Sequence, residues 1–127
     1  MDDKLLNGGA LAFVGDAVMT LQVREYLVNK GITHLKDLQE KTSSMVSAKA
    51  QAAFSKTIEE DLTEEEMEIF KRGRNFKSNS TAKNASVLDY RHATGVEALW
   101  GYWYLENNED RLKEMCDRLI AFNESNG

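Results

Sequence analysis

The sequence contains no proline and only one cysteine among its 127 residues. Proline is the residue that breaks helices most strongly, and the high content of alanine, leucine, glutamate and lysine favours helix throughout. The single cysteine, Cys116, rules out a disulfide within the chain and is typical of a reducing compartment. We therefore expect an all-α protein in the cytoplasm.

Long hydrophobic runs are missing as well. The first residues, MDDKLLNGG, hold no apolar stretch of signal-peptide length, and no run reaches the roughly 20 apolar residues that span a bilayer. With 42% hydrophobic and 29% charged residues, the chain has the composition of a globular protein. We expect one domain over residues 1–127 and no membrane partner.

The charges are strongly segregated. A net charge of −5 argues by itself against a nucleic-acid partner. However, residues 59–68 contain seven acids and no base, whereas residues 71–83 contain five bases and no acid. These five bases are Lys71, Arg72, Arg74, Lys77 and Lys83. The net charge therefore hides a local basic patch.

Apolar residues recur at helical spacing along most of the chain. The predicted helices span about residues 10–29, a short segment capped by Thr33, then about 46–58, 63–73, 86–105 and 109–122. Gly31 and Gly73 are expected to end two of these helices, and TSS at 42–44 is expected to interrupt another. Thr63 and Glu66 form a capping box. The polar segment 73–84 reads as a loop, so we expect six or seven helices in all.

Two acids lie in the middle of otherwise apolar helices. Asp16 interrupts AFVGDAVMTL and Glu97 interrupts ATGVEALWGYWYL. On a helical wheel, small side chains predominate among the neighbours of both acids, which are Gly9, Ala12, Thr20, Ala93, Thr94, Gly101 and Tyr104. Small neighbours leave room for a ligand beside a carboxylate, where a core helix would place leucine or isoleucine.

The two acids allow two interpretations. Each could pair with a base such as Arg24, Arg91 or His92, or both could bind one cation. A few oxygen ligands suit Mg²⁺, which keeps waters or substrate phosphates in its shell. Since no cysteine lies near either acid, a zinc site is poorly supported. A magnesium site of this kind is typical of phosphoryl transfer.

Other candidate residues have weaker signals. The basic patch combines Lys and Arg with Ser and Asn, the residue types that contact phosphates, although a solvated surface loop has the same composition. Lys49 in VSAKAQAA is either a further phosphate contact or an exposed helical lysine, and the sequence favours the second reading. The aromatic stretch Trp100, Tyr102, Trp103 and Tyr104 is expected to belong to the core and an interface, rather than to stack on bases.

Several segments, in this order, resemble one family. ALAFVGDAV (10–18) resembles the signature helix of ribonuclease III, and GVEALWGYWYL (95–105) resembles the second acidic helix of its catalytic domain. VSAKAQAA (46–53), KRGRNFKSNS (71–80) and AKNASVLDYRHATG (82–95) resemble the mini-ribonuclease III branch, which lacks a double-stranded-RNA-binding domain. The resemblance covers nearly the whole chain.

The resemblance assigns roles to the two acids. Asp16 matches the signature aspartate and Glu97 matches the metal-bridging glutamate, so both are implied catalytic residues and Mg²⁺ ligands. Three acids of the larger ribonucleases III fall here on Gly9, Ala12 and Thr94, as they do in the mini branch. With only two carboxylates, we expect one weakly held Mg²⁺ whose shell is completed by waters and RNA phosphates.

The resemblance also implies partners and products. Family members are homodimers that cut both strands of double-stranded RNA, leaving a 5′-phosphate, a 3′-hydroxyl and a short 3′ overhang. Phe13 matches an aromatic residue that packs into the partner subunit. The basic patch would contact the backbone, and the implied substrate is the stem of the 23S ribosomal RNA precursor. Because a dimer carries twice the charge of −5, a ribosomal protein that presents the RNA is a further candidate partner.

Two other functions stay open at this point. The chain could be a catalytically silent double-stranded-RNA-binding domain, because three acids of the larger enzymes are missing. It could also be a helical protein–protein interaction module whose two acids are structural.

Overall fold

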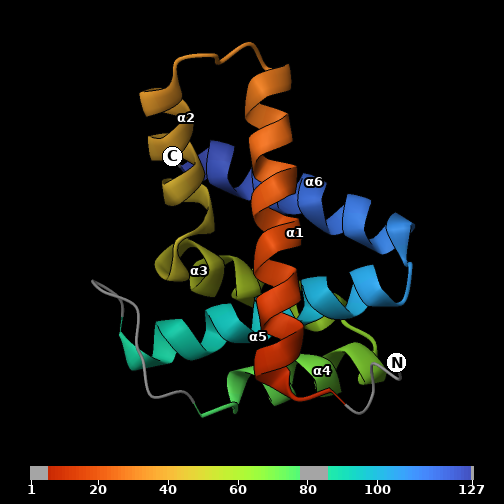
Figure 1. Cartoon of the computed structure of the whole chain (residues 1–127). Helices are drawn as coiled ribbons and strands as arrows, with labels where there is room; N and C mark the ends of the chain where they lie inside the picture. Colours follow the sequence, from red (N-terminus) through yellow and green to blue (C-terminus); the bar gives the residue numbers. More distant parts are fainter. Residues whose placement is uncertain (1–5, 78–85, 127) are drawn as a thin grey trace.

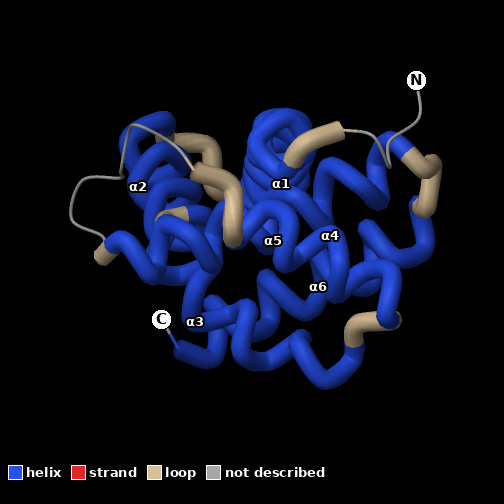
Figure 2. Tube along the Cα trace, turned by 90° about the horizontal axis from the view of Figure 1, so that it is seen from below, coloured by secondary structure: helices blue, strands red, loops and turns tan. Residues whose placement is uncertain are grey.

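The computed structural model describes residues 6–77 and 86–126, and every regular element in these two ranges is helical (Figures 1 and 2). The elements are α1 (Gly8–Asn29), α2 (Leu35–Val46), α3 (Ala48–Ile58), a short 3-10 helix η2 (Glu59–Asp61), α4 (Glu64–Arg74), α5 (Val87–Leu105) and α6 (Glu109–Asn126). The predicted all-α class is therefore confirmed.

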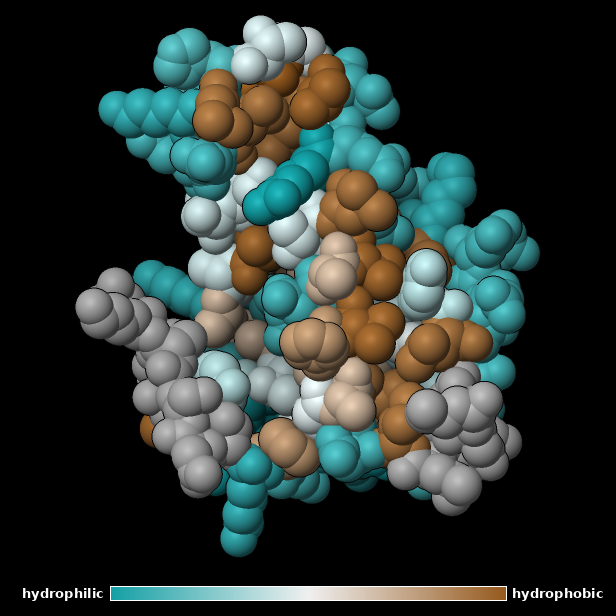
Figure 3. All heavy atoms as spheres, in the orientation of Figure 1, coloured by the Kyte–Doolittle hydropathy of each residue, from teal (hydrophilic) through white to brown (hydrophobic). Residues whose placement is uncertain are grey.

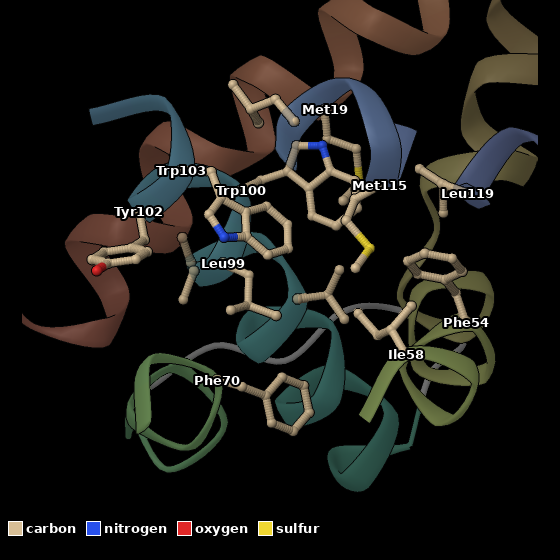
Figure 4. Close-up of a cluster of buried hydrophobic side chains, with 14 of the residues drawn as sticks. Met19, Phe54, Ile58, Phe70, Leu99, Trp100, Tyr102, Trp103, Met115 and Leu119 are labelled. Carbon is tan, nitrogen blue, oxygen red and sulfur yellow. The ribbon is translucent and has the colours of Figure 1, made fainter. Parts of the chain in front are cut away.

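Helix α5 forms the centre of the fold. In Figure 1, α1 crosses over α5, and α3 and α4 also pack against it. Trp100 and Trp103 of α5 are completely buried, and Figure 4 shows them among side chains from α1, α3 and α6, such as Phe54 and Met115. The aromatic stretch is thus core, as predicted, except that Tyr104 is 53% exposed.

Two predictions about helix α2 are wrong. Helix α2 is capped at His34 instead of Thr33, and it runs through residues 42–44 to Val46 because Thr42 is buried against the core and Ser44 Oγ donates to the Lys41 carbonyl. The break follows at Ser47, whose side chain caps α3.

The prediction that Gly73 ends α4 is wrong as well. The helix continues to Arg74, and Gly73 is buried where α4 meets α5, with no room for a methyl group beside Ala98. In contrast, Gly31 does follow α1 with a φ of 103°, a conformation that favours glycine. Ser86 caps α5 and the Thr63–Glu66 capping box is present.

Glu66 does not belong to a solvated acidic face, because it is only 6% exposed. It accepts hydrogen bonds from Trp103 Nε1 at 2.8 Å and from Arg111 Nη2 at 2.8 Å, and Arg111 also lies over the Trp103 ring. Arg111 lowers the pKa of Glu66, although burial acts in the opposite direction. This network joins α4, α5 and α6.

Helices α1 and α5 touch through their main chains. A methyl group on Gly15 would overlap the carbonyl oxygen of Glu97, and one on Gly101 would overlap the carbonyl oxygen of Leu11. Both glycines are required for this close approach, since any side chain would separate the helices. The contact lies next to Asp16 in sequence, so it brings the two acids to the same crossing.

Candidate active site

An open pocket beside the α1–α5 crossing contains both predicted acids. It is lined by Gly9, Ala12, Phe13 and Asp16 of α1, by Phe76 after α4, and by Tyr90, Thr94 and Glu97 of α5. Helical geometry explains the set, because residues three or four positions apart share one face of a helix. The structure therefore places Asp16 and Glu97 at one site, although they are far apart in sequence.

The two carboxylates interact with each other. Asp16 is exposed, whereas Glu97 is partly buried. Burial, together with hydrogen bonding and charge repulsion from Asp16, raises the pKa of Glu97 to about 8, from an ordinary value of 4.5. Ionising both acids in this pocket is therefore costly, and a cation between them would offset the repulsion.

The alternative that each acid pairs with a protein base receives no support. Among the described residues, no salt bridge joins Asp16 or Glu97 to a base. Arg24 lines a different groove, and His92 Nδ1 lies 2.9 Å from the Leu88 carbonyl oxygen. The charge of the acid pair is not neutralised by these side chains.

Some of the small residues around the acids border open space, whereas others lie against neighbouring atoms. Ala12 and Thr94 line the pocket, as expected for positions that leave room for a ligand. The space at Gly101, however, is filled by the backbone of α1. At Gly9 the Phe76 ring fills the position, since a methyl group there would lie 2.6 Å from it.

Gln51 is a site residue that the sequence analysis missed. It lies on α3 and is buried, and its Nε2 donates to Glu97 Oε2 at 3.3 Å. This bond favours the ionised carboxylate and so partly opposes the rise in the pKa of Glu97. A polar residue among the apolar positions of α3 was the available signal.

Some of the basic residues predicted to contact phosphates are exposed, whereas others form contacts within the protein. Arg72 is engaged elsewhere, because its Nη1 donates to the Leu6 carbonyl at 3.0 Å and its Nη2 lies 3.4 Å from Glu68. Arg74 Nε donates to the Asn75 side chain. Lys71, Lys77 and Lys49 are exposed, and Lys77 follows the pocket residue Phe76. Lys83 lies outside the described residues.

An exposed apolar stripe runs along α1. Phe13 is 81% exposed, Leu21 58% and Val28 52%, and the first of them also lines the pocket. Figure 3 shows hydrophobic surface along the face on which α1 lies in Figure 1. Within the described residues, no helix combines the length and apolar character that a membrane crossing requires.

Comparison with known proteins identifies the family. Residues 9–108 match the family model of the ribonuclease III domain. The chain is 49% identical over 121 residues to a Mini-ribonuclease 3 from Enterococcus faecalis, and the aligned region covers 94% of this chain and 92% of that protein. It is 47% identical over 120 residues to the Mini-ribonuclease 3 of Clostridium tetani, and this alignment covers 94% of this chain and 80% of that protein. The chain belongs to the ribonuclease III family, on its mini-ribonuclease III branch.

A crystal structure of a protein from Fusobacterium nucleatum has the same fold as this mini-ribonuclease III chain. The two superpose with a TM-score of 0.84 at 33% identity, over 92% of this chain and 93% of that one. The fold class and the family resemblance expected from the sequence are thus confirmed, and membership of the family supports a ribonuclease activity.

The pocket of this mini-ribonuclease III chain presents carboxylate oxygens, and membership of the ribonuclease III family suggests a requirement for a divalent metal ion. Carboxylate oxygens are ligands that Mg²⁺ prefers, and no basic side chain within the described residues forms a salt bridge with Asp16 or Glu97. Across residues 6–77 and 86–126, no group of three or more His, Cys, Asp or Glu side chains could hold a metal. Two carboxylates leave most of the coordination shell to waters or to substrate oxygens.

Glu97→Gln is expected to stabilise the chelator-treated protein at pH 9 and to change it little at pH 5. Between about pH 4.5 and pH 8 the native state holds a proton on Glu97 that the unfolded chain has lost, so the stability of the wild type falls as the pH rises. Glutamine stays neutral and avoids this loss. In thermal melts with chelator, we expect the variant's melting temperature to exceed that of the wild type by on the order of 5 °C at pH 9.

The matched control for this prediction is Glu25→Gln, an exposed acid on α1 that lines a different pocket. Its effect on the melting temperature should not depend on pH in this way. A gain for Glu97→Gln that is equal at pH 5 and pH 9 would contradict the assignment.

Proposed function

We propose that the chain is a Mg²⁺-dependent endoribonuclease that cleaves double-stranded RNA and matures the stem of the 23S ribosomal RNA precursor. The observation that carries the proposal is the pair Asp16 and Glu97, two carboxylates in one open pocket of a ribonuclease III domain that form no salt bridge with a base in the described part of the chain. We place the enzyme in the cytoplasm, acting as one catalytic domain over residues 1–127.

Different residues at the pocket would have different roles in phosphodiester hydrolysis. Asp16 and Glu97 would hold Mg²⁺, and the bound ion would polarise the scissile phosphate and lower the pKa of the attacking water. Glu97 must lose its proton to serve as a ligand, and Gln51 favours the form without the proton. The products would be a 5′-phosphate and a 3′-hydroxyl.

The RNA backbone would lie across the exposed basic side chains. Lys71 and Lys77 are accessible for phosphate contacts, and Lys77 adjoins the pocket through Phe76. Duplex RNA is recognised mainly by its shape, through phosphates and 2′-hydroxyls, so these contacts give little base specificity. Binding should therefore weaken steeply with salt. A ribosomal protein that presents the RNA would add the missing selectivity.

We further propose that the enzyme works as a homodimer. An aromatic side chain that is 81% exposed is costly to leave in water, and Phe13 continues into the apolar residues Leu21 and Val28 along one helix. A second copy would cover this stripe. Since Phe13 also lines the pocket, each active site would then adjoin the interface.

The deciding experiment is cleavage of long double-stranded RNA at low salt, with Mg²⁺ and with chelator. We expect duplex fragments with 5′-phosphate ends only when Mg²⁺ is present, and no cleavage of single-stranded RNA. Retained binding of the duplex without cleavage would favour the silent binding domain. This is the second candidate because, among the described residues, no third His, Cys, Asp or Glu joins the two acids in a metal-binding group. Neither binding nor cleavage would favour the protein–protein interaction module.

A further inference from the structure

The side chain of Gln51 joins two distant parts of the chain. It projects from α3 and is only 1% exposed. Its Nε2 donates to the carbonyl oxygen of Val46, the last residue of α2, at 2.8 Å, and to Glu97 Oε2 on α5 at 3.3 Å. One amide nitrogen thus uses both of its hydrogens, one on the backbone and one on a carboxylate of the pocket.

The orientation of the amide follows from its partners. The backbone carbonyl oxygen of Val46 can only accept hydrogen bonds, so the NH₂ group must face it, and the same nitrogen then lies 3.3 Å from Glu97 Oε2. The shorter bond, to Val46, anchors the amide, and the second hydrogen is then aimed at Glu97. Turning the amide over would place its oxygen against the Val46 carbonyl oxygen, and the hydrogen bond between them would be lost.

This arrangement leaves Gln51 Oε1 buried without a hydrogen-bond partner among the described residues. A buried polar atom without a partner lowers stability, and native proteins contain few of them. The neighbouring buried residues of α3 include Ala52, Phe54 and Ile58. An apolar side chain at position 51 would avoid this loss, so stability alone does not account for glutamine here.

We propose that Gln51 is a positioning residue that fixes the carboxylate of Glu97 toward the pocket for cation binding. A carboxylate held through one oxygen keeps the other for a ligand, and partners of this kind orient metal ligands in many sites. The inference rests on the proposed function, because it assumes that Glu97 binds a cation. It gives the mini-ribonuclease III site a third side chain, contributed by α3.

The test compares Gln51→Met with the wild type. Methionine keeps the length of the side chain and is unbranched, but it has no N–H to donate. Mn²⁺ serves as the probe, titrated into the full chain without RNA and followed by electron paramagnetic resonance of the free ion. We expect about tenfold weaker Mn²⁺ binding in Gln51→Met, with a melting temperature in chelator that is not lower than that of the wild type by more than a few degrees.

Two further variants make the comparison sharp. Ser55→Ala removes a buried hydroxyl one turn along α3, and this hydroxyl donates to the Ala52 carbonyl oxygen rather than to either acid. It should leave Mn²⁺ binding unchanged. Gln51→Leu provides a second apolar replacement in case methionine packs poorly, and it should weaken Mn²⁺ binding to a similar extent.

The outcomes separate the inference from the proposed function. If the wild type neither binds Mn²⁺ nor cleaves duplex RNA, the proposed function fails and the inference falls with it. If the wild type does both, and folded Gln51→Met binds Mn²⁺ as tightly as the wild type, only the inference is overturned. Weaker binding in both Gln51 variants, but not in Ser55→Ala, would support it.

Discussion

Asp16→Asn is expected to lower RNA cleavage by on the order of 10³-fold or more, while the protein stays folded and still binds duplex RNA. Asparagine keeps the size of the side chain and removes the negative charge, so the pocket retains one carboxylate for the cation. Stability should change little, because Asp16 is exposed and asparagine keeps a side-chain oxygen that can accept a hydrogen bond from the protonated Glu97 carboxyl. A loss of this size corresponds to about 4 kcal/mol in the activation free energy.

The measurement is the initial rate of duplex cleavage at a fixed Mg²⁺ concentration, together with a gel shift of the same duplex in chelator. Glu25→Gln is the control, because it removes an exposed charge from the same helix away from the pocket. If Asp16→Asn cleaves at a rate close to that of the control, Asp16 is not a catalytic residue.

Gly15→Ala is expected to destabilise the protein by at least about 3 kcal/mol. This is the upper end of the destabilisation that an added methyl group usually causes in a packed core. The methyl group would overlap the backbone carbonyl of Glu97, which has no rotamer to change, so α1 and α5 must move apart. That movement separates Asp16 from Glu97 and loosens the contact at the centre of the fold. We therefore also expect weaker cleavage wherever the variant remains folded. Urea unfolding measures the change in stability.

Gly9→Ala is the matched control for the helix crossing. It makes the same chemical change in the same helix, with the same gain in helix propensity. Its methyl group would meet the ring of Phe76, a half-exposed side chain that can shift, rather than backbone. We expect a change within about 1 kcal/mol. Equal effects of the two variants would mean that the crossing is not held by the close approach at Gly15.

The parts of the site that could be predicted from the sequence are those with a local signal. Asp16 and Glu97 each interrupt an apolar helix, and an acid in that setting is visible within one turn of its neighbours. Their meeting in one pocket followed from the family resemblance, and the structure shows it directly. The capping box of Thr63 and Glu66 was equally local, since a cap acts on the next three residues.

What could not be predicted depends on contacts between distant segments. Gln51 and Glu97 are 46 residues apart, so no periodicity within α3 shows their hydrogen bond. Gly101 was interpreted as room for a ligand, because a helical wheel does not show that another backbone fills the space. Arg72 was grouped with a basic patch, but its hydrogen bond to the Leu6 carbonyl, 66 residues away, arises only in the folded chain.

The glycine contact between α1 and α5 has a consequence for how this protein can change over generations. Because Gly15 and Gly101 bring main chain against main chain, the separation of the two helices at the acids does not depend on the volume of any side chain there. Substitutions elsewhere in the interior, such as exchanges at Met19 or Met115, can then accumulate without altering the spacing of the acid pair. The backbone contact at the crossing therefore keeps the distance between the two acids while core residues elsewhere are substituted.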